Sequence, residues 1–198
     1  MPVIETYFPT HVYVEERIDN FVDVQKEMKE CVKNVEFSFH EKWGTHYLTD
    51  LNFQSDLLHK MPVFSKELSK HIEQYCNTMK FYEKTRIEVV SSWFSKFLKG
   101  NHGHIHNHKG SDISGVYYHQ TSGDDGNIFF TTPNPFTEVG ECWSSDRHNH
   151  EPKEGKLLIF PGWLRHGITT NLTNNIRISF SFNLKVHEWA NEYRFFWS

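Results

Sequence analysis

The segment from Ile176 to Leu184 alternates between apolar and polar residues. Its apolar positions are Ile176, Ile178, Phe180 and Phe182, and its polar positions are Arg177, Ser179, Ser181 and Asn183. A period of two is typical of a β-strand that packs one face against a core. We therefore expect the apolar face to be buried and the other face to direct Arg177, Ser179 and Asn183 into one shared space.

The pattern of the whole chain changes near residue 86. Upstream, residues 11–14 are typical of a short strand, and residues 21–32 and 63–82 have apolar side chains at helical spacing. Downstream, β-rich segments separated by turn signals cover residues 86–98, 113–119, 128–132, 156–160, 167–170 and 176–184. This order predicts a mainly β protein with N-terminal helices, in which two helices buttress one sheet of a jelly roll.

The length of the chain suits a single domain. Its 198 residues contain no internal repeat and no Pro/Gly-rich boundary, so we expect one domain over residues 1–198. Residues 1–85 would form a helical support, residues 86–184 the jelly-roll core and residues 185–198 a C-terminal tail. The aromatic residues of this tail would pack on their own sheet or on a partner, which makes a homodimer possible.

Charge and composition exclude several classes of partner. The net charge of -4 and the pI near 6.4 give no bulk attraction to nucleic acid or to anionic membranes. The apolar runs are far shorter than the ~20 residues of a membrane-spanning helix. The first residues do not resemble a secretory signal, and three widely spaced cysteines fit a reducing compartment. We expect a cytoplasmic protein that binds neither membrane nor nucleic acid.

Histidines concentrate just before one of the predicted strands. His104, His106 and His108 alternate with other residues, and residues i and i+2 of a strand project from the same face. His106 and His108, or His104 and His106, would then face one metal ion. A carboxylate normally completes a two-histidine iron site, and the nearest candidate is Asp112. A polar surface loop is the alternative interpretation.

Two further residues favour the metal site. His166 follows the predicted strand 156–160 and a Pro-Gly turn. Such a turn can direct the next side chain toward the interior of the protein. Arg177 lies on the polar face of the alternating strand, where no acidic residue neighbours it. A buried guanidinium needs an anion, and a carboxylate ligand would provide a bidentate partner. The alternative is that Arg177 lies on a solvent face.

Three motifs in this order resemble a known family. Residues 106–118, 155–166 and 177–183, with Phe8-Pro9-Thr10 and Ser92-Trp93 as minor matches, look like the 2-oxoglutarate- and Fe(II)-dependent oxygenases of bacteria and phages. The resemblance implies a double-stranded β-helix, which is the distorted jelly roll that prolyl hydroxylases share. It covers essentially the whole chain.

The resemblance also implies roles for single residues. His106 matches the first iron ligand, and His166 matches the distal one. Arg177 matches the arginine that pairs with the far carboxylate of 2-oxoglutarate, with Ser179 and Tyr118 beside it.

The family usually has His-x-Asp where this chain has His106-Asn107-His108. We expect His108 to replace the carboxylate and give a three-histidine site, with Asp112 or a water as the alternative.

These residues predict an enzyme, a 2-oxoglutarate-dependent dioxygenase with Fe(II) and 2-oxoglutarate as cofactors and His106, His108, His166 and Arg177 as catalytic residues. Its substrate would be a protein or peptide side chain, which it would hydroxylate, or a small metabolite. Two alternatives stay open. One is a cupin-like jelly roll that binds metal without turnover, and the other is a three-histidine dioxygenase that needs no cosubstrate.

Overall fold

A computed structural model describes residues 3, 9–49, 56–79, 85–133, 147–188 and 194–196 of the chain. Its N-terminal part contains strands β1 (Tyr13–Glu15), β2 (Phe37–Phe39) and β3 (Tyr47–Thr49), helices α1 (Phe21–Lys33), α2 (Asp56–His59) and α3 (Pro62–Thr78), and a 3-10 turn (Glu41–Trp43). The remaining strands are β4 (Thr85–Phe97), β5 (Gly103–His106), β6 (Ile113–Gln120), β7 (Ile128–Thr131), β8 (Arg147–His150), β9 (Leu157–Pro161), β10 (His166–Ile168), β11 (Arg177–Glu188) and β12 (Arg194–Phe196).

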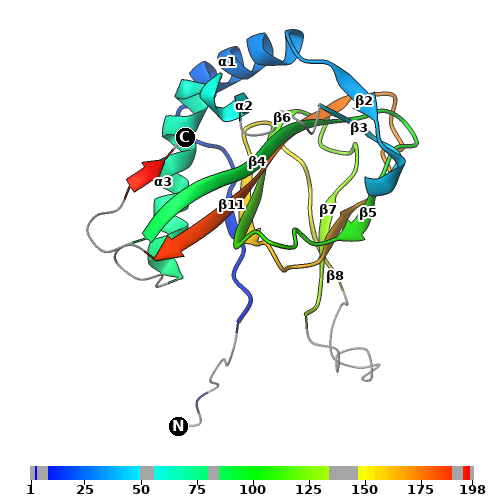
Figure 1. Ribbon diagram of the computed structural model, residues 1–198. Helices are drawn as coiled ribbons and strands as arrows, with labels where there is room; N and C mark the ends of the chain where they lie inside the picture. Colours follow the sequence, from blue (N-terminus) through cyan, green and yellow to red (C-terminus); the bar gives the residue numbers. More distant parts are fainter. Residues whose placement is uncertain are drawn as a thin grey trace.

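The strands form two sheets. The larger sheet has the order β1-β9-β6-β11-β4-β3-β2, and β12 pairs with β4 in parallel. The smaller sheet has the order β5-β10-β7-β8. All pairs other than β12–β4 are antiparallel, which is the arrangement of a jelly roll. In Figure 1, β5, β7 and β8 lie on one side of β4 and β11, and the long helices lie on the other.

Helices α1 and α3 cover the outer face of the larger sheet. Val24 and Met28 of α1 and Phe64 of α3 are fully buried in one apolar cluster. Phe180 of β11 belongs to the same cluster, and its ring meets that of Phe64 edge to face at 5.4 Å. The predicted pair of buttressing helices is therefore confirmed.

Glu27 of α1 joins the two long helices. Its carboxylate accepts hydrogen bonds from the backbone amides of Val63 (2.9 Å) and Phe64 (2.8 Å). These amides lie in the first turn of α3 and have no partner within the helix. Met61 precedes α3 without a side-chain cap, so a carboxylate from a neighbouring helix takes over the capping role.

A second, smaller apolar cluster lies between the two sheets. Val116 and Tyr118 of β6 and Phe160 of β9 contribute from the larger sheet, and Ile128 and Phe130 of β7 contribute from the smaller one. Tyr117, the neighbour of Tyr118 on β6, belongs to the helix-side cluster instead. Successive residues of a strand point to opposite faces, so β6 is buried on both sides and contributes to both clusters.

Most predicted elements are present, with different ends. The strand predicted to end at Leu184 continues to Glu188, and residues 194–196 form β12, so the predicted tail holds part of the larger sheet. The predicted support, residues 1–85, contains three strands besides its helices. Part of the second predicted helix, residues 80–82, lies outside the described residues. Among the described helices, none has both the length and the apolar character needed to span a membrane.

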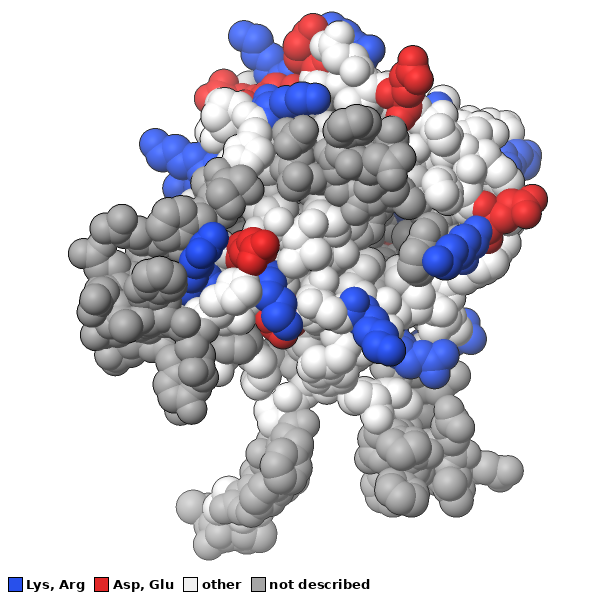
Figure 2. All heavy atoms as spheres, in the orientation of Figure 1, with Lys and Arg blue, Asp and Glu red and all other residues white. Residues whose placement is uncertain are grey.

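Charged side chains of both signs are interspersed on the surface over α1, at the top of Figure 2. The charged residues of α1 alternate in sign along the helix, in the order Asp23, Lys26, Glu27, Lys29, Glu30 and Lys33. One such pair, Lys33 and Glu30, is 2.8 Å apart and well exposed. Exposed pairs of this kind contribute little to stability, typically less than about 1 kcal/mol. The helical layer is held by its apolar face.

His119 of β6 should make folding sensitive to acid. Its side chain is 8% exposed, and burial, together with the charge of Lys29, lowers its pKa to about 4. Unfolded chains take up this proton near pH 6.5. The unfolded state therefore binds more protons between these two pH values, and the free energy of unfolding falls as pH decreases from about 6.5 to about 4.

We predict that His119→Leu loses less stability over this range than the wild type does. The full shift corresponds to roughly 3 kcal/mol, of which about 2 kcal/mol falls between pH 7 and pH 5, so urea unfolding at these two pH values should resolve the difference. His11→Leu, at an exposed position, serves as the control. Equal losses in the wild type and His119→Leu would contradict the assignment.

Candidate active site

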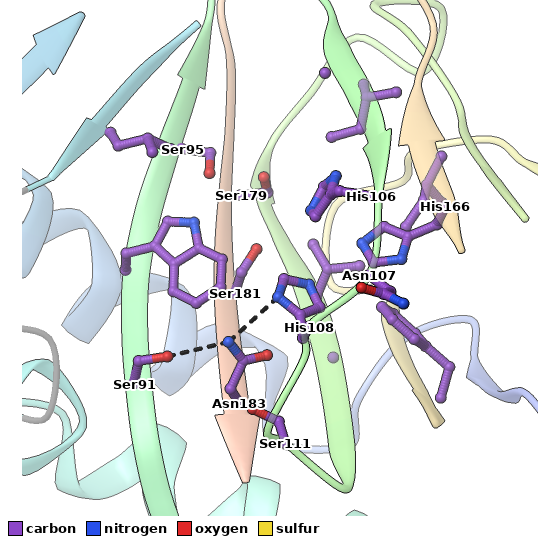
Figure 3. A pocket seen from close by; sticks show the side chains of 18 of the residues that line it. Ser91, Ser95, His106, Asn107, His108, Ser111, His166, Ser179, Ser181 and Asn183 are labelled. Carbon is purple, nitrogen blue, oxygen red and sulfur yellow. Dashed lines mark hydrogen bonds between the residues drawn. The ribbon is translucent and has the colours of Figure 1, made fainter. Parts of the chain in front are cut away.

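A cavity of about 430 Å³ lies between the two sheets. Its polar wall is built by β4 and β11, which are paired so that Ser95 faces Ser179, Trp93 faces Ser181 and Ser91 faces Asn183. The opposite wall carries His106, His108 and His166, as Figure 3 shows. The period of two in residues 177–183 thus places Arg177, Ser179 and Asn183 along one cavity, as the sequence predicts.

The smaller sheet brings His106 and His166 together. His106 ends β5 and His166 begins β10, and the two residues are direct antiparallel partners. Side chains of such a pair project from the same face of the sheet. Their ring centroids are 4.5 Å apart. The distal histidine therefore reaches the first one through strand pairing across 60 positions of sequence.

His108 joins this pair from a turn. The strand β5 ends at His106, so His108 does not lie two residues along the same strand, as the sequence reasoning assumed. The backbone amide of His108 donates to the carbonyl of Gly162 (2.8 Å), which anchors the turn to the end of β9. A Cβ at Gly162 would collide with the carbonyl of Ser111, so this close approach requires glycine.

The three imidazoles have the spacing of a shared metal ion. One ligand nitrogen from each ring can be chosen so that all three lie within 4.8 Å of one another. The ring of His108 is 5.1 Å from that of His106 and 5.0 Å from that of His166. Because a metal–imidazole bond is about 2.1 Å long, two rings that bind one ion at roughly a right angle have centroids about 4.6 Å apart. The spacing of the three rings therefore allows them to bind one metal ion together, all from the same side of the ion.

Second contacts orient two of these rings. Nδ1 of His106 donates to the backbone carbonyl of His104 (2.7 Å), and Nδ1 of His166 donates to that of Leu164 (2.9 Å). A neutral imidazole with its hydrogen on Nδ1 has its lone pair on Nε2, which is the tautomer that binds metal through Nε2.

All three rings are held neutral. Burial, reinforced by the charge of His106, lowers the pKa of His108 to about 3. Burial is also the main cause of the lowered pKa values of His106 and His166, and the effect is largest for His166. Only the neutral form of imidazole coordinates a metal ion.

Arg177 lies in the wall of the same cavity and is fully buried. Its Nη1 donates to the carbonyl of Gly126, and its Nε and Nη2 have no hydrogen-bond partner among the described residues. The guanidinium carbon is 4.0 Å from the centroid of the Phe97 ring. Burial lowers the pKa of Arg177, against the smaller opposing effects of Tyr118 and Asp125. Burying a cation with two unused donors is energetically unfavourable unless an anionic ligand accepts hydrogen bonds from them.

Tyr118 and Ser179 lie beside Arg177. They are direct partners on β6 and β11, both are 2% exposed, and both line the cavity. The ring centroid of Tyr118 is 6.0 Å from the guanidinium carbon of Arg177. Burial raises the pKa of Tyr118 to about 12, so its hydroxyl keeps its proton at neutral pH and remains a hydrogen-bond donor.

Asp112 and His104 lie apart from the cluster. The carboxylate of Asp112 accepts a hydrogen bond from the amide of Val186 (2.8 Å) and is 3.2 Å from Nζ of Lys185. It belongs neither to the metal-sized cluster nor to the cavity wall. His104 is exposed, and its ring neighbours that of His102 at 5.3 Å.

His46 lies in the site although its sequence context did not predict it. This residue follows a turn at Gly44, which has φ = 145°. A Cβ at Gly44 would collide with the carbonyl of His102, so the turn requires glycine. The buried ring of His46 lines the cavity and stacks on Phe97, with centroids 4.3 Å apart. Burial lowers its pKa to about 4. No motif surrounds it, and only the fold brings it to β5.

No acidic residue lines the cavity among the described residues, although Arg177, Lys109 and four histidines do. A metal ion bound by three neutral imidazoles would keep its full positive charge. The cavity as a whole therefore favours a ligand with at least two negative charges, one for the metal ion and one for Arg177.

The comparisons with known proteins agree with this geometry. Residues 91–183, nearly half of the chain, match a family model described as "Putative 2OG-Fe(II) oxygenase". The matched segment contains the three clustered histidines, Arg177, Ser179 and Tyr118. A search of curated proteins gives no match.

Solved structures resemble the fold over nearly its whole length. A prolyl-4-hydroxylase from Pseudomonas putida matches with a TM-score of 0.60 and 14% identity, covering 89% of this chain and 92% of that one. HygX from Streptomyces hygroscopicus, crystallised with nickel, 2-oxoglutarate and hygromycin B, matches with a TM-score of 0.62 and 12% identity, covering 89% and 83%.

A third similar structure is the non-heme alpha-ketoglutarate-dependent epimerase SnoN from nogalamycin biosynthesis. It matches with a TM-score of 0.65 and 11% identity, covering 89% of this chain and 76% of that one. At such low identity these likenesses establish the fold, which is the jelly roll of these enzymes. The family match and the fold together indicate a 2OG/Fe(II)-dependent oxygenase.

We predict that His166→Ala weakens metal binding far more than His104→Ala does. His104 lies outside the cavity, and its backbone carbonyl, which orients His106, survives the change. Loss of a ligand should exceed the roughly 10- to 100-fold cost of losing an outer-shell partner. Titration of the metal-free protein with Co(II), followed by visible absorption, measures both affinities. Equal affinities would show that His166 is not a ligand.

Proposed function

We propose that this chain is a 2-oxoglutarate-dependent dioxygenase with a three-histidine Fe(II) site. His106, His108 and His166 would hold the metal ion, and Arg177 would bind the far carboxylate of 2-oxoglutarate. When bound, Fe(II) and 2-oxoglutarate supply the oxidising chemistry, in which O₂, 2-oxoglutarate and a substrate C–H group give succinate, CO₂ and a hydroxylated product. One oxygen atom enters succinate and the other enters the product.

One observation carries this proposal. The three histidines share a cavity with a fully buried guanidinium that has two unused donors, and no described acidic residue lines that cavity. 2-Oxoglutarate has a negative charge at each end. Its keto-acid end suits the metal ion, and its other carboxylate suits Nε and Nη2 of Arg177. Ser179 and Tyr118 would add hydroxyl donors to the same carboxylate.

The protein's own contribution is orientation and exclusion of water. Arg177, Tyr118 and Ser179 are all buried, so a carboxylate among them exchanges its water for fixed donors. Val116 and Phe160 back the cavity with apolar surface. Apolar walls protect a reactive centre from side reactions with water.

A dioxygenase that needs no cosubstrate is the second candidate. The observation that favours this candidate is His108. It occupies the position at which the family that this chain resembles has a carboxylate. Such an enzyme would have no use for a buried arginine with unused donors, and Arg177 therefore favours the 2-oxoglutarate-dependent reaction. A cupin-like protein without turnover would bind metal but form no succinate.

The substrate is proposed to be a protein or peptide side chain, with a small metabolite as the second choice. Val90 and Lys109 line the cavity and are exposed, so they lie where it opens to solvent. Trp93 of β4 also lines the cavity, and its ring is 5.8 Å from that of His108. Val90 is an extra residue of β4 at a bulge opposite the Asn183–Leu184 step, and bulges next to active sites commonly redirect a side chain. An open rim of this kind admits one side chain from a larger molecule.

Arg177→Met tests the proposed function. The variant should still bind the metal ion, because it leaves the three histidines unchanged. Losing one partner of a buried charge pair costs about 2 kcal/mol or more, so 2-oxoglutarate should bind at least roughly 30-fold more weakly. The rise in Tm caused by 2-oxoglutarate and the Fe(II)-dependent formation of succinate should fall together.

Arg165→Met is the matched control, because Arg165 is exposed and lies near Arg177 in the sequence. It should leave both measurements unchanged. Succinate formation by Arg177→Met at the wild-type rate and the wild-type affinity would refute the role of Arg177. Oxygen uptake by the wild type without 2-oxoglutarate would favour the cosubstrate-free enzyme.

A further inference from the structure

Asn183 contacts His108, the candidate ligand to which the described residues offer no backbone carbonyl as a hydrogen-bond acceptor. Its amide Nδ2 is 3.3 Å from Nδ1 of His108 and 3.1 Å from Oγ of Ser91, and its Oδ1 accepts a hydrogen bond from Oγ of Ser114 (2.8 Å). Figure 3 shows two of these contacts as a line from Ser91 through Asn183 to His108. Nδ1 of His108 is therefore engaged, as Nδ1 is in His106 and His166.

The sheet holds Asn183 in this place from both sides. Asn183 is the direct partner of Ser91 on β4 and of Ser114 on β6, and all three residues are buried. The two serines fix the plane of the amide. A hydroxyl can donate or accept, so they do not decide which end of the amide faces His108.

The orientation of this amide determines the tautomer of His108. If the amide nitrogen donates to Nδ1, the lone pair of the neutral ring is on Nδ1 and its hydrogen is on Nε2. Nε2 then cannot bind a metal ion. If the amide is rotated by 180°, Oδ1 accepts from Nδ1–H of His108 and from the hydroxyl of Ser91, and Nδ2 donates to Ser114. Every contact still joins a donor to an acceptor.

We propose that Asn183 is a positioning residue that places the hydrogen of His108 on Nδ1 and thereby makes Nε2 the third metal ligand. This inference rests on the proposed three-histidine site and adds the group that makes a histidine usable at the third position. His106 and His166 obtain the same tautomer from backbone carbonyls, which only accept hydrogen bonds. Asn183 supplies that acceptor to His108 through its side chain.

The proposal predicts different effects for two substitutions of similar size. Asn183→Asp provides only acceptor oxygens toward His108, so it should bind Zn(II) within a few-fold of the wild type, or more tightly. Asn183→Leu removes the acceptor and should bind Zn(II) roughly 10- to 100-fold more weakly, the usual cost of losing an outer-shell partner. Ser95→Ala, which removes a hydroxyl elsewhere in the same wall, should have no such effect.

The direct measurement is the ¹⁵N–¹H NMR spectrum of the His108 ring in the Zn(II)-loaded wild type, with Zn(II) affinities from competition titration. A hydrogen on Nδ1 with Nε2 bound to the ion, together with rescue by Asn183→Asp, supports the proposal. A hydrogen on Nε2, or equal losses in Asn183→Asp and Asn183→Leu, overturns it. Wild-type Zn(II) affinity in Asn183→Leu also overturns the positioning role of Asn183, but it leaves the proposed function intact. Failure of the wild type to bind Zn(II) at this cluster would instead refute the three-histidine site itself.

Discussion

A cavity whose wall carries no acidic side chain among the described residues is the constraint on which this structure depends. Among the described residues, the cavity wall has one buried arginine, one exposed lysine and four histidines, and no acid. Burial keeps the imidazoles neutral and leaves Arg177 with two unused donors. Such a site is unfavourable when empty and becomes favourable when an anion and a metal cation enter together.

In this jelly roll the two sheets contribute different parts of the site. The larger sheet is packed on one side by α1 and α3, and its β11 carries Arg177, Ser179 and Asn183 on the other side. The smaller sheet contributes His106 and His166 as a strand pair. Metal ligands and cosubstrate anchor thus come from different sheets, and the distance between the sheets sets the size of the molecule that can bridge them.

The sequence predicted the parts of the site that local periodicity encodes. The alternation in residues 176–184 identified the cavity face of β11, and helical spacing identified α1 and α3. The strand β5 was missed as a strand because Gly103–His106 is short and polar. The strand β8 and, in the N-terminal part, β2 and β3 were also missed, whereas residues 11–14 correctly indicated β1. His106 and His108 were grouped by strand geometry, whereas a turn anchored to Gly162 brings His108 into place.

Long-range contacts explain what the sequence could not predict. His46 reaches the cavity because Gly44 allows a turn to pass close to His102, and no local pattern encodes that approach. The part of Asn183 in orienting His108 depends on serines from two other strands. The ligand roles of His106, His108 and His166, and the anchoring role of Arg177, stay predictions that the geometry supports.

The most direct test is an anaerobic titration of the Fe(II)-loaded protein with 2-oxoglutarate, followed by visible absorption. Chelation of the metal ion by the keto-acid end should produce a weak charge-transfer band in the green region that saturates at one equivalent. Absence of the band, with oxygen uptake that persists without 2-oxoglutarate, would contradict the account and identify a three-histidine enzyme of a different kind.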